Sequence, residues 1–269
     1  MKAESKKTET IKILFIGDIV GKPGRQVVTK LLPSLRKEKQ IDFVVANGEN
    51  LSSGKGMTKE KYDEMLRSGV DYFTSGNHIW DNRDIIPYLK DKLVKVLRPA
   101  NYPSNCPGEG VVNIEINGHK VTIINLLGQV FIPVLSESPF KVAKEIVDEN
   151  KDSIILIDIH AEATSEKIAL GHYLDGQVSV VVGTHTHVQT ADETILEEGT
   201  AYISDLGMCG PKDSVLGVEK GIIIKQFLTA LPQSHKVAVG TTIFNACLVE
   251  IDTDTKRAVS IQRVYQTVK

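Results

Sequence analysis

The chain of 269 residues has only three cysteines, and no two of them form a C-x-x-C pair: Cys106, Cys209 and Cys247. An odd number of widely spaced cysteines argues against a disulfide framework. The thiols therefore favour a reducing compartment, and we expect a cytoplasmic protein. Cys209 lies in the segment GMCGP without a paired base nearby, so we expect a buried or loop thiol rather than a nucleophile.

Long apolar runs are also lacking. The best candidates, such as SIILIDI, are far shorter than the roughly eighteen residues of a membrane-spanning helix. The opening MKAESKKTET lacks the apolar core and cleavage site of a secretory signal. We therefore expect no membrane span and a flexible polar tail over residues 1–10. Residues 11–269 are expected to form a single domain, because no linker divides them.

The chain has no large excess of charge of either sign, since its formal net charge is −2. It therefore lacks the basic field that holds proteins on nucleic acid or acidic membranes, and we expect no stable complex with either. Arg25, Lys55 and Arg83 are expected to be solvated surface charges. A homo-oligomer stays open, because no coiled-coil heptad or exposed apolar helix favours a number of subunits.

Strand-like apolar runs alternate with amphipathic stretches through most of the chain. Buried strands are expected in IKILFIGD, DFVVANGEN, VDYFTSGNH, SIILIDIH and SVVVGTHTH. Helices are expected from Pro23 to about Gln40 and in TKEKYDEMLRSG, DIIPYLKD, SPFKVAKEIVDEN, TSEKIALGHYL and GVEKGIIIKQFLTAL. Asn117-Gly118 predicts a hairpin turn, and FNACLVEID with AVSIQRVY predicts a terminal antiparallel pair. The pattern indicates an α/β fold with two mixed sheets packed together and helices outside.

Polar residues that commonly bind metals follow five of these strands. They are Asp18, Glu49, Asn50, Asn77, His78, His160, His185 and His187. The carboxyl ends of parallel strands meet at one edge of a sheet, so we expect these side chains to gather there.

Each of these residues taken singly also has a simpler structural role. Asp18 could cap a turn, Asn77 could begin a helix, and a lone His160 could be a structural histidine. The pair His185 and His187 is more specific. Residues two apart in an extended segment point to the same face, so both rings could reach one ion.

Without His78, the set provides three imidazoles, two carboxylates and two amide oxygens, and no thiolate. Such donors suit iron or manganese, with zinc as an alternative. Seven donors exceed the needs of one ion, so we expect two ions bridged by Glu49. Ions about 3.5 to 4 Å apart lower the pKa of a shared water and clamp a phosphodiester. The expected mechanism is attack by a bridging hydroxide, while His78 assists the leaving alkoxide.

Several long segments resemble the YmdB family of bacterial calcineurin-like metallophosphoesterases. They are GDIVGKPGR, VANGENLSSGKGMT, SGNHIWDNRDI, RPANYP, IHAEATSEK, VVGTHTHVQTADE and AYISDLGMCGP. The resemblance covers nearly the whole chain after the first ten residues. It implies a four-layer αββα sandwich, a dinuclear iron centre and hydrolysis of 2',3'-cyclic nucleotides, which are small-molecule substrates.

The resemblance also implies how the ligands are divided. One ion would take Asp18, Glu49, Asn50 and His187, and the other would take Glu49, Asn77, His160 and His185, with a catalytic role for His78. The residue two after Asp18 is Val20 rather than the histidine of a D-x-H motif, so Asn50 would replace that donor. Leu127 and Gln129 stand where polar or basic residues are common in the family.

Two other functions stay open at this point. The same pair of ions would serve a phosphatase or a phosphodiesterase acting on other phosphoesters. The glycines of GDIVGKPG suggest instead a non-catalytic nucleotide-binding regulator. That segment, however, has neither the G-x-G-x-x-G spacing nor a GK[ST] ending.

Overall fold

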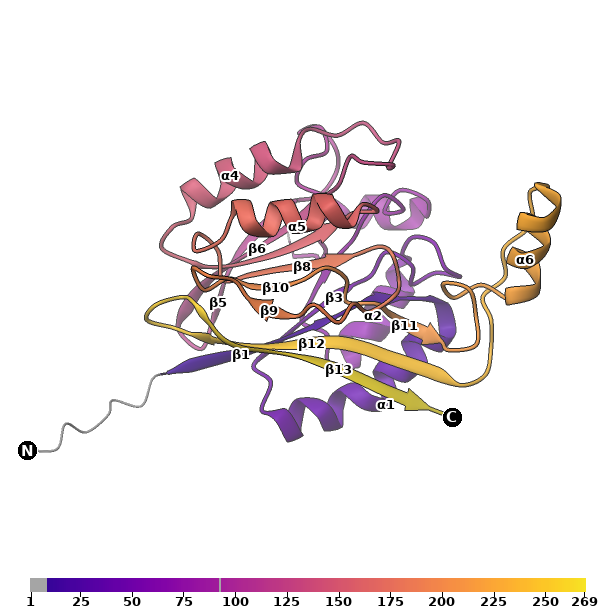
Figure 1. The fold of residues 1–269 in the computed structure, drawn as a ribbon, viewed down its shortest axis with the longest axis horizontal. Helices are drawn as coiled ribbons and strands as arrows, with labels where there is room; N and C mark the ends of the chain where they lie inside the picture. The colour runs from indigo at the N-terminus through magenta and orange to yellow at the C-terminus, as the bar shows by residue number, and fades with distance from the viewer. Residues whose placement is uncertain (1–8, 92) are drawn as a thin grey trace, which may run out of the picture.

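The computed structural model describes residues 9–91 and 93–269. Two β-sheets pack face to face, and helices cover their outer surfaces (Figure 1). The strands are β1 Thr10–Ile16, β2 Asp18–Ile19, β3 Phe43–Asn47, β4 Tyr72–Thr74, β5 Val111–Ile116, β6 His119–Leu127, β7 Ile154–His160, β8 Val180–Thr184, β9 Thr194–Ile195, β10 Ala201–Ile203, β11 Met208–Pro211, β12 Thr242–Asp252 and β13 Ala258–Val268. The helices are α1 Gly21–Lys39, α2 Lys59–Arg67, the 3-10 helix η1 Arg83–Ile85, α3 Ile86–Leu89, α4 Pro139–Glu149, α5 Thr164–Tyr173 and α6 Lys220–Thr229.

Both sheets are mixed, as the sequence predicts. The first has the order β2-β11-β12-β1-β3-β4, with β13 beside β12. Its strand β1 runs parallel to β3 and antiparallel to β12. The second has the order β5-β6-β7-β8-β10-β9, in which β6, β7, β8 and β10 are parallel. The predicted hairpin joins β5 to β6, and β12 and β13 form the predicted antiparallel pair.

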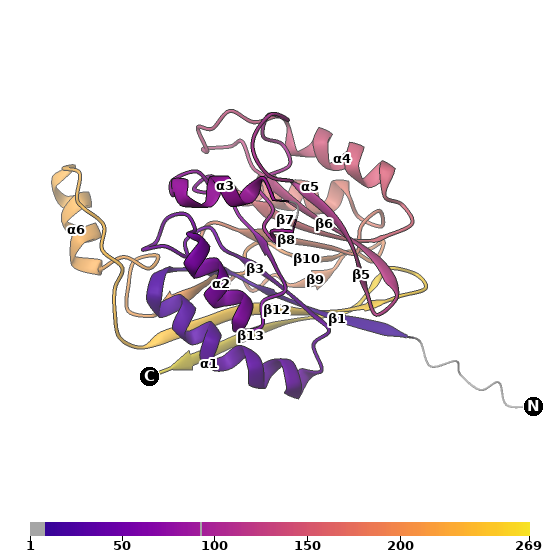
Figure 2. The same ribbon diagram turned by 180° about the vertical axis from the view of Figure 1, so that it is seen from behind.

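Three apolar clusters correspond to the three contacts between four layers. The first packs α1 and α2 on the first sheet, the second fills the space between the sheets, and the third packs α4 and α5 on the second sheet. Strand β1 shows the alternation: Leu14 and Ile16 face the helices, whereas Ile13 and Phe15 face the other sheet. The expected four-layer αββα sandwich is confirmed, and Figure 2 shows the helical layers from behind.

Helix α6 stands apart from this sandwich (Figures 1 and 2). It lies in an excursion, residues 212–241, that we call the arm. The arm connects β11 to β12, which pair with each other, and its two ends meet where the N–H of Lys212 donates to the carbonyl of Thr241 at 2.8 Å. None of the residues of α6 is buried, and Phe227 and Leu228 are each 81% exposed.

The chain ends and helix starts show smaller differences from expectation. Residues 1–8 of the expected tail lie outside the described residues, and Thr10 already belongs to β1. Helix α1 begins at Gly21 rather than Pro23, whereas α2 has the expected cap at Thr58. Among the described residues, no helix combines the length and apolar character needed to cross a membrane.

The layered core predicts that truncation of a buried side chain lowers the stability of the fold far more than truncation of an exposed one. Phe15→Ala removes a ring that is 1% exposed between the sheets, and should lower the free energy of unfolding by about 3–5 kcal/mol. Phe227→Ala is the matched control on α6 and should have little effect. Chemical denaturation of both variants measures the difference, and equal losses would contradict this description of the core.

Candidate metal centre

The donors predicted from the sequence converge from both sheets. Asp18, Glu49, Asn50, Asn77 and His78 lie at or just after the ends of strands in the first sheet. His160, His185 and His187 lie at or just after the ends of β7 and β8 in the second. The expectation of one edge of one sheet is therefore wrong. Because the sheets pack face to face, two edges supply the site.

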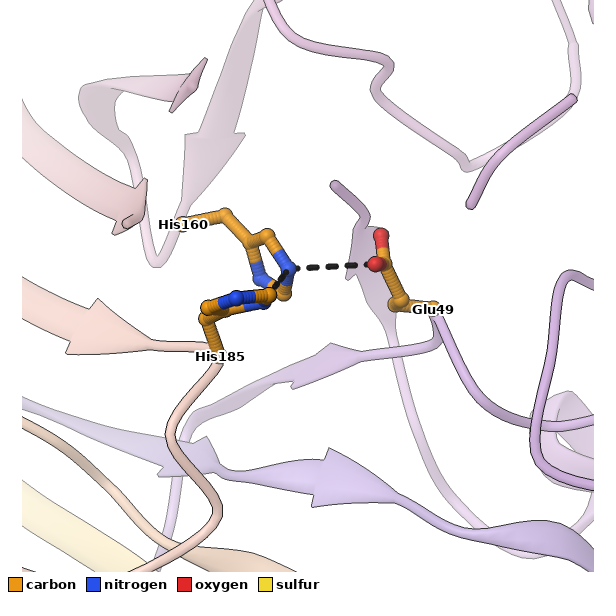
Figure 3. Close-up of side chains that lie close together, drawn as sticks. All are labelled: Glu49, His160 and His185. Carbon is orange, nitrogen blue, oxygen red and sulfur yellow. Dashed lines mark hydrogen bonds and ion pairs between the residues drawn. The ribbon is translucent and has the colours of Figure 1, made fainter. Parts of the chain in front are cut away.

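Glu49, His160 and His185 form the closest group (Figure 3). Nε2 of His160 lies 3.1 Å from Oε1 of Glu49 and 2.9 Å from Nδ1 of His185. One donor atom from each side chain lies within 4.8 Å of the others, and Glu49 and His160 are buried. A carboxylate and two imidazoles this close can hold a divalent cation.

Asp18 and His187 lie beside this group. Oδ1 of Asp18 is 3.7 Å from Nε2 of His187 and 3.9 Å from Nδ1 of His160. The other oxygen, Oδ2, accepts the backbone N–H of His185 at 3.2 Å. Asp18 therefore contacts histidines of the second sheet and leaves Oδ1 available.

Five side-chain oxygens of the predicted ligands are buried without hydrogen-bond partners in the described part of the chain. They are Oδ1 of Asp18, both Oε atoms of Glu49, Oδ1 of Asn50 and Oδ1 of Asn77. The close approach of Glu49 to His160 brings their charges together without the geometry of a hydrogen bond. Unpartnered buried acceptors are costly, so their grouping fits a site for cations. Asn50 donates Nδ2 to the carbonyl of Gly54 at 2.9 Å, which leaves its oxygen free for a cation.

A buried hydrogen-bond network orients His160. The hydroxyl of Thr184 donates to Oδ1 of Asp158 at 2.8 Å, so it accepts from Nδ1 of His160 at 3.0 Å. Asp158 also accepts from Thr74 and Asn47. With Nδ1 bound in this way, Nε2 is directed at Glu49. Asp158 is not among the residues predicted from the sequence, although its position two residues before His160 places both on one face of β7.

The loop that carries His185 and His187 is not extended, contrary to expectation. Strand β8 ends at Thr184, and both histidines have positive φ, 100° and 64°. This backbone costs energy in residues other than glycine and needs support from its surroundings. Oδ2 of Asp205 supplies it by accepting the N–H of Thr186 at 3.0 Å, and a buried ion pair with Lys167 at 2.8 Å holds Asp205.

The arm orients His187. Nδ1 of His187 donates to the carbonyl of Leu216 at 3.0 Å, which leaves Nε2 facing Asp18. A cavity of about 260 Å³ opens beside it. Its lining includes Glu49, Asn50, His78, Glu162, His185, Thr186, His187 and Leu216.

His78 and Glu162 stand at this cavity. Nδ1 of His78 contacts Oδ2 of Asp81 at 2.8 Å. Glu162, which is not among the residues predicted from the sequence, lies 3.1 Å from Nε2 of His185 and is about half exposed. Asn77 makes no hydrogen bond to another predicted ligand among the described residues, and its Oδ1 is buried without a partner.

The protonation states are those of a site that holds a proton in place of a cation. Burial lowers the pKa of His160, but Glu49 and Asp18 outweigh burial and raise it to about 9. Burial, together with His160, lowers the pKa of His185 to about 3. His160 therefore carries the proton between Glu49 and His185 at neutral pH. Burial also raises the pKa of Asp18 to about 8.

Two further predictions concern residues near the site. Arg25 is buried rather than solvated, and it donates to the carbonyl of Leu51 at 2.6 Å and to Glu64 at 2.8 Å. Its pairing with α2 explains why a cation is tolerated there, and it braces the loop after Asn50. Cys209 is a buried thiol as expected, and burial raises its pKa to about 12.

Comparison with known proteins agrees with these motifs. The model of the family described as YmdB-like protein matches residues 14–264. The chain belongs to the YmdB-like family. A Bacillus subtilis relative named 2',3'-cyclic-nucleotide 2'-phosphodiesterase is 47% identical over 94% of this chain and 96% of its own.

Two solved structures share the fold of this YmdB-like chain. A hypothetical protein from Thermus thermophilus has a TM-score of 0.91 at 38% identity, covering 96% of this chain and all of its own. A structure titled as a novel phosphatase from Mycoplasma pneumoniae has a TM-score of 0.92 at 35% identity, covering 97% and 94%.

The side chains of the site pack tightly against Gly76. A Cβ at Gly76 would lie 2.1 Å from Cδ2 of His160 and 2.3 Å from Oε2 of Glu49. Gly76→Ala should therefore push these groups apart and lower the bound metal per chain at least several-fold, as measured by elemental analysis. Gly221→Ala, where a Cβ meets nothing within 4 Å, is the control. Equal metal contents in the two variants would contradict this geometry.

Proposed function

We propose that this chain is a two-metal phosphodiesterase that hydrolyses 2',3'-cyclic nucleotides to nucleoside monophosphates. The observation that carries the proposal is that the unpartnered buried oxygens of Asp18 and Glu49 lie beside His160, His185 and His187 where the two sheets meet. The name of the Bacillus subtilis relative supports the choice of substrate.

Seven side chains would hold the two cations. Asp18, Glu49, Asn50 and His187 would hold one cation, and Glu49, Asn77, His160 and His185 would hold the other. Oxygen and nitrogen donors without thiolate favour iron, with manganese or zinc as alternatives. When bound, two such cations lower the pKa of a water molecule and stabilise negative charge on the phosphate.

A side chain of the protein then protonates the leaving oxygen. As the oxygen of water bonds to phosphorus, the water gives up a proton to solvent, the bond from phosphorus to the 2' oxygen breaks, and the product is the 3'-monophosphate. His78 supplies a proton to the departing 2' oxygen. The contact of its Nδ1 with Asp81 leaves Nε2 to do so, and the cavity beside Glu49 and His185 leaves room for the substrate.

The direct test is to supply metal-loaded protein with 2',3'-cyclic AMP and separate the products by chromatography. We expect adenosine 3'-monophosphate to accumulate without release of inorganic phosphate. Release of inorganic phosphate from simple monoesters, with the cyclic diester left intact, would refute the proposal in favour of a phosphatase.

The role of His78 is tested by His78→Ala. Loss of a general acid typically lowers turnover by about 100-fold or more, so kcat should fall to that degree while metal content stays near normal. His172→Ala, an exposed histidine on α5, is the control. Unchanged turnover in His78→Ala would remove this residue from the mechanism.

The pKa of His160 predicts how metal uptake depends on pH. At pH 7 the metal-free site holds protons on His160 and on Asp18, because their pKa values are about 9 and about 8, and cations can bind only after these protons leave. Mn²⁺ affinity should therefore rise with pH and level off above about 9. Titration calorimetry at pH 7 in buffers with different ionisation enthalpies counts the released protons. Heats independent of the buffer would contradict this.

A further inference from the structure

A second cavity, of about 390 Å³, lies on the side of Leu216 next to β12 and β13. It shares His187 and Leu216 with the cavity at the metal centre, so the two adjoin. Its other lining residues include Lys212, Asn245 and Tyr265. We call it the Tyr265 pocket. Its volume lies within the range of small-molecule sites.

Asn245 brings a buried amide to this pocket. Its side chain is 2% exposed, and its Oδ1 has no hydrogen-bond partner in the described part of the chain. Its backbone carbonyl accepts the N–H of Gly17 at 3.1 Å, immediately before the predicted ligand Asp18. The amide is therefore held close to the strand that leads into the metal centre, with an acceptor left for a ligand.

Tyr265 brings an aromatic face. It is opposite Asn245 in the antiparallel pairing of β12 and β13, so the two side chains lie on the same face of the sheet. Tyr265 is 55% exposed, and Nζ of Lys212 lies 6.0 Å from the centre of its ring. An exposed ring beside a buried amide and a cation matches the needs of a nucleobase attached to a phosphate.

We propose that the Tyr265 pocket binds the base of the cyclic nucleotide. The base stacks on the ring of Tyr265, and its exocyclic amine donates to Oδ1 of Asn245. Lys212 contributes positive charge beside the ring. This inference rests on the proposed function, because the metal centre must hold the phosphate while the base extends past Leu216.

Another cavity of about 340 Å³ touches the same two residues, His187 and Leu216, from the side of the loop at Lys55. Its lining includes His235 and Gln233 from the arm. It has no phenylalanine, tyrosine or tryptophan, and none of its described lining residues has an unpartnered buried side-chain atom. The Tyr265 pocket is therefore the better site for a base, and His235 provides a control on the opposite side.

The test compares a substrate that has a base with one that lacks it. The pair is 2',3'-cyclic AMP and glycerol 1,2-cyclic phosphate, which share the five-membered cyclic diester. The readout is the kcat/KM for 2',3'-cyclic AMP divided by the kcat/KM for glycerol 1,2-cyclic phosphate. Loss of one stacking contact should lower this ratio about tenfold in Tyr265→Ala, whereas Tyr265→Phe keeps the ring and the ratio. His235→Ala should leave the ratio near that of the unmodified protein.

Binding of adenosine 3'-monophosphate provides a readout that does not need turnover. Calorimetry should show an affinity about tenfold lower for Tyr265→Ala than for Tyr265→Phe. An unchanged ratio and unchanged binding in Tyr265→Ala, or a loss in His235→Ala instead, would overturn the pocket. Failure of the unmodified protein to hydrolyse either diester would refute the proposed function, and product binding would still decide the pocket.

The contact with Asn245 has its own test. Adenine carries an exocyclic amine and uracil does not, so 2',3'-cyclic AMP should be preferred over 2',3'-cyclic UMP. Asn245→Ala should reduce that preference at least several-fold. Absence of the preference in the unmodified protein would overturn the amine contact. Metal content is measured in parallel, since Asn245 lies beside the strand that leads to Asp18.

Discussion

The approach of His160 to Glu49 joins the two sheets at one end of the sandwich, and the rest of the site is arranged around it. Both side chains are buried, so their charges need compensation inside the protein. The hydroxyl of Thr184 fixes one nitrogen of His160 and directs the other at the carboxylate. The buried pair of Lys167 and Asp205 then holds the neighbouring histidine loop in a backbone conformation that it would not adopt alone.

Much of this architecture could be predicted because local sequence patterns determine it. Buried strands appear as apolar runs, and the polar residues that follow them mark the ends of strands. The division of the donors between two sheets could not be predicted, because it depends on contacts between β7, β8 and strands more than a hundred residues away. The positive φ angles of His185 and His187 were missed for a similar reason. The loop between them is held by Asp205, which no spacing rule connects to them.

Burial was equally hard to foresee for charged residues. In the sequence Arg25 looks like one of several basic residues near the loops of the predicted ligands, yet Glu64 and the carbonyl of Leu51 enclose it. Glu162 and Asp158 are also ordinary acidic residues in the sequence, and only the folded positions of their neighbours set them apart. The arm illustrates the same limit. Its pattern predicts a helix, but not that Leu216 would meet His187 and separate two cavities.

The origin of the donors in two separate sheets has a thermodynamic consequence. A cation held by Glu49 and His160 would act as a further cross-link between halves of the sandwich that already adhere through apolar contacts and through the hydrogen bonds that Asp158 accepts from Thr74 and Asn47. Binding of the cation would then stabilise the packing of one sheet against the other, and that packing would in turn strengthen binding of the cation. Removal of a methyl group deep between the sheets, far from every donor atom, would therefore lower the affinity for the cation.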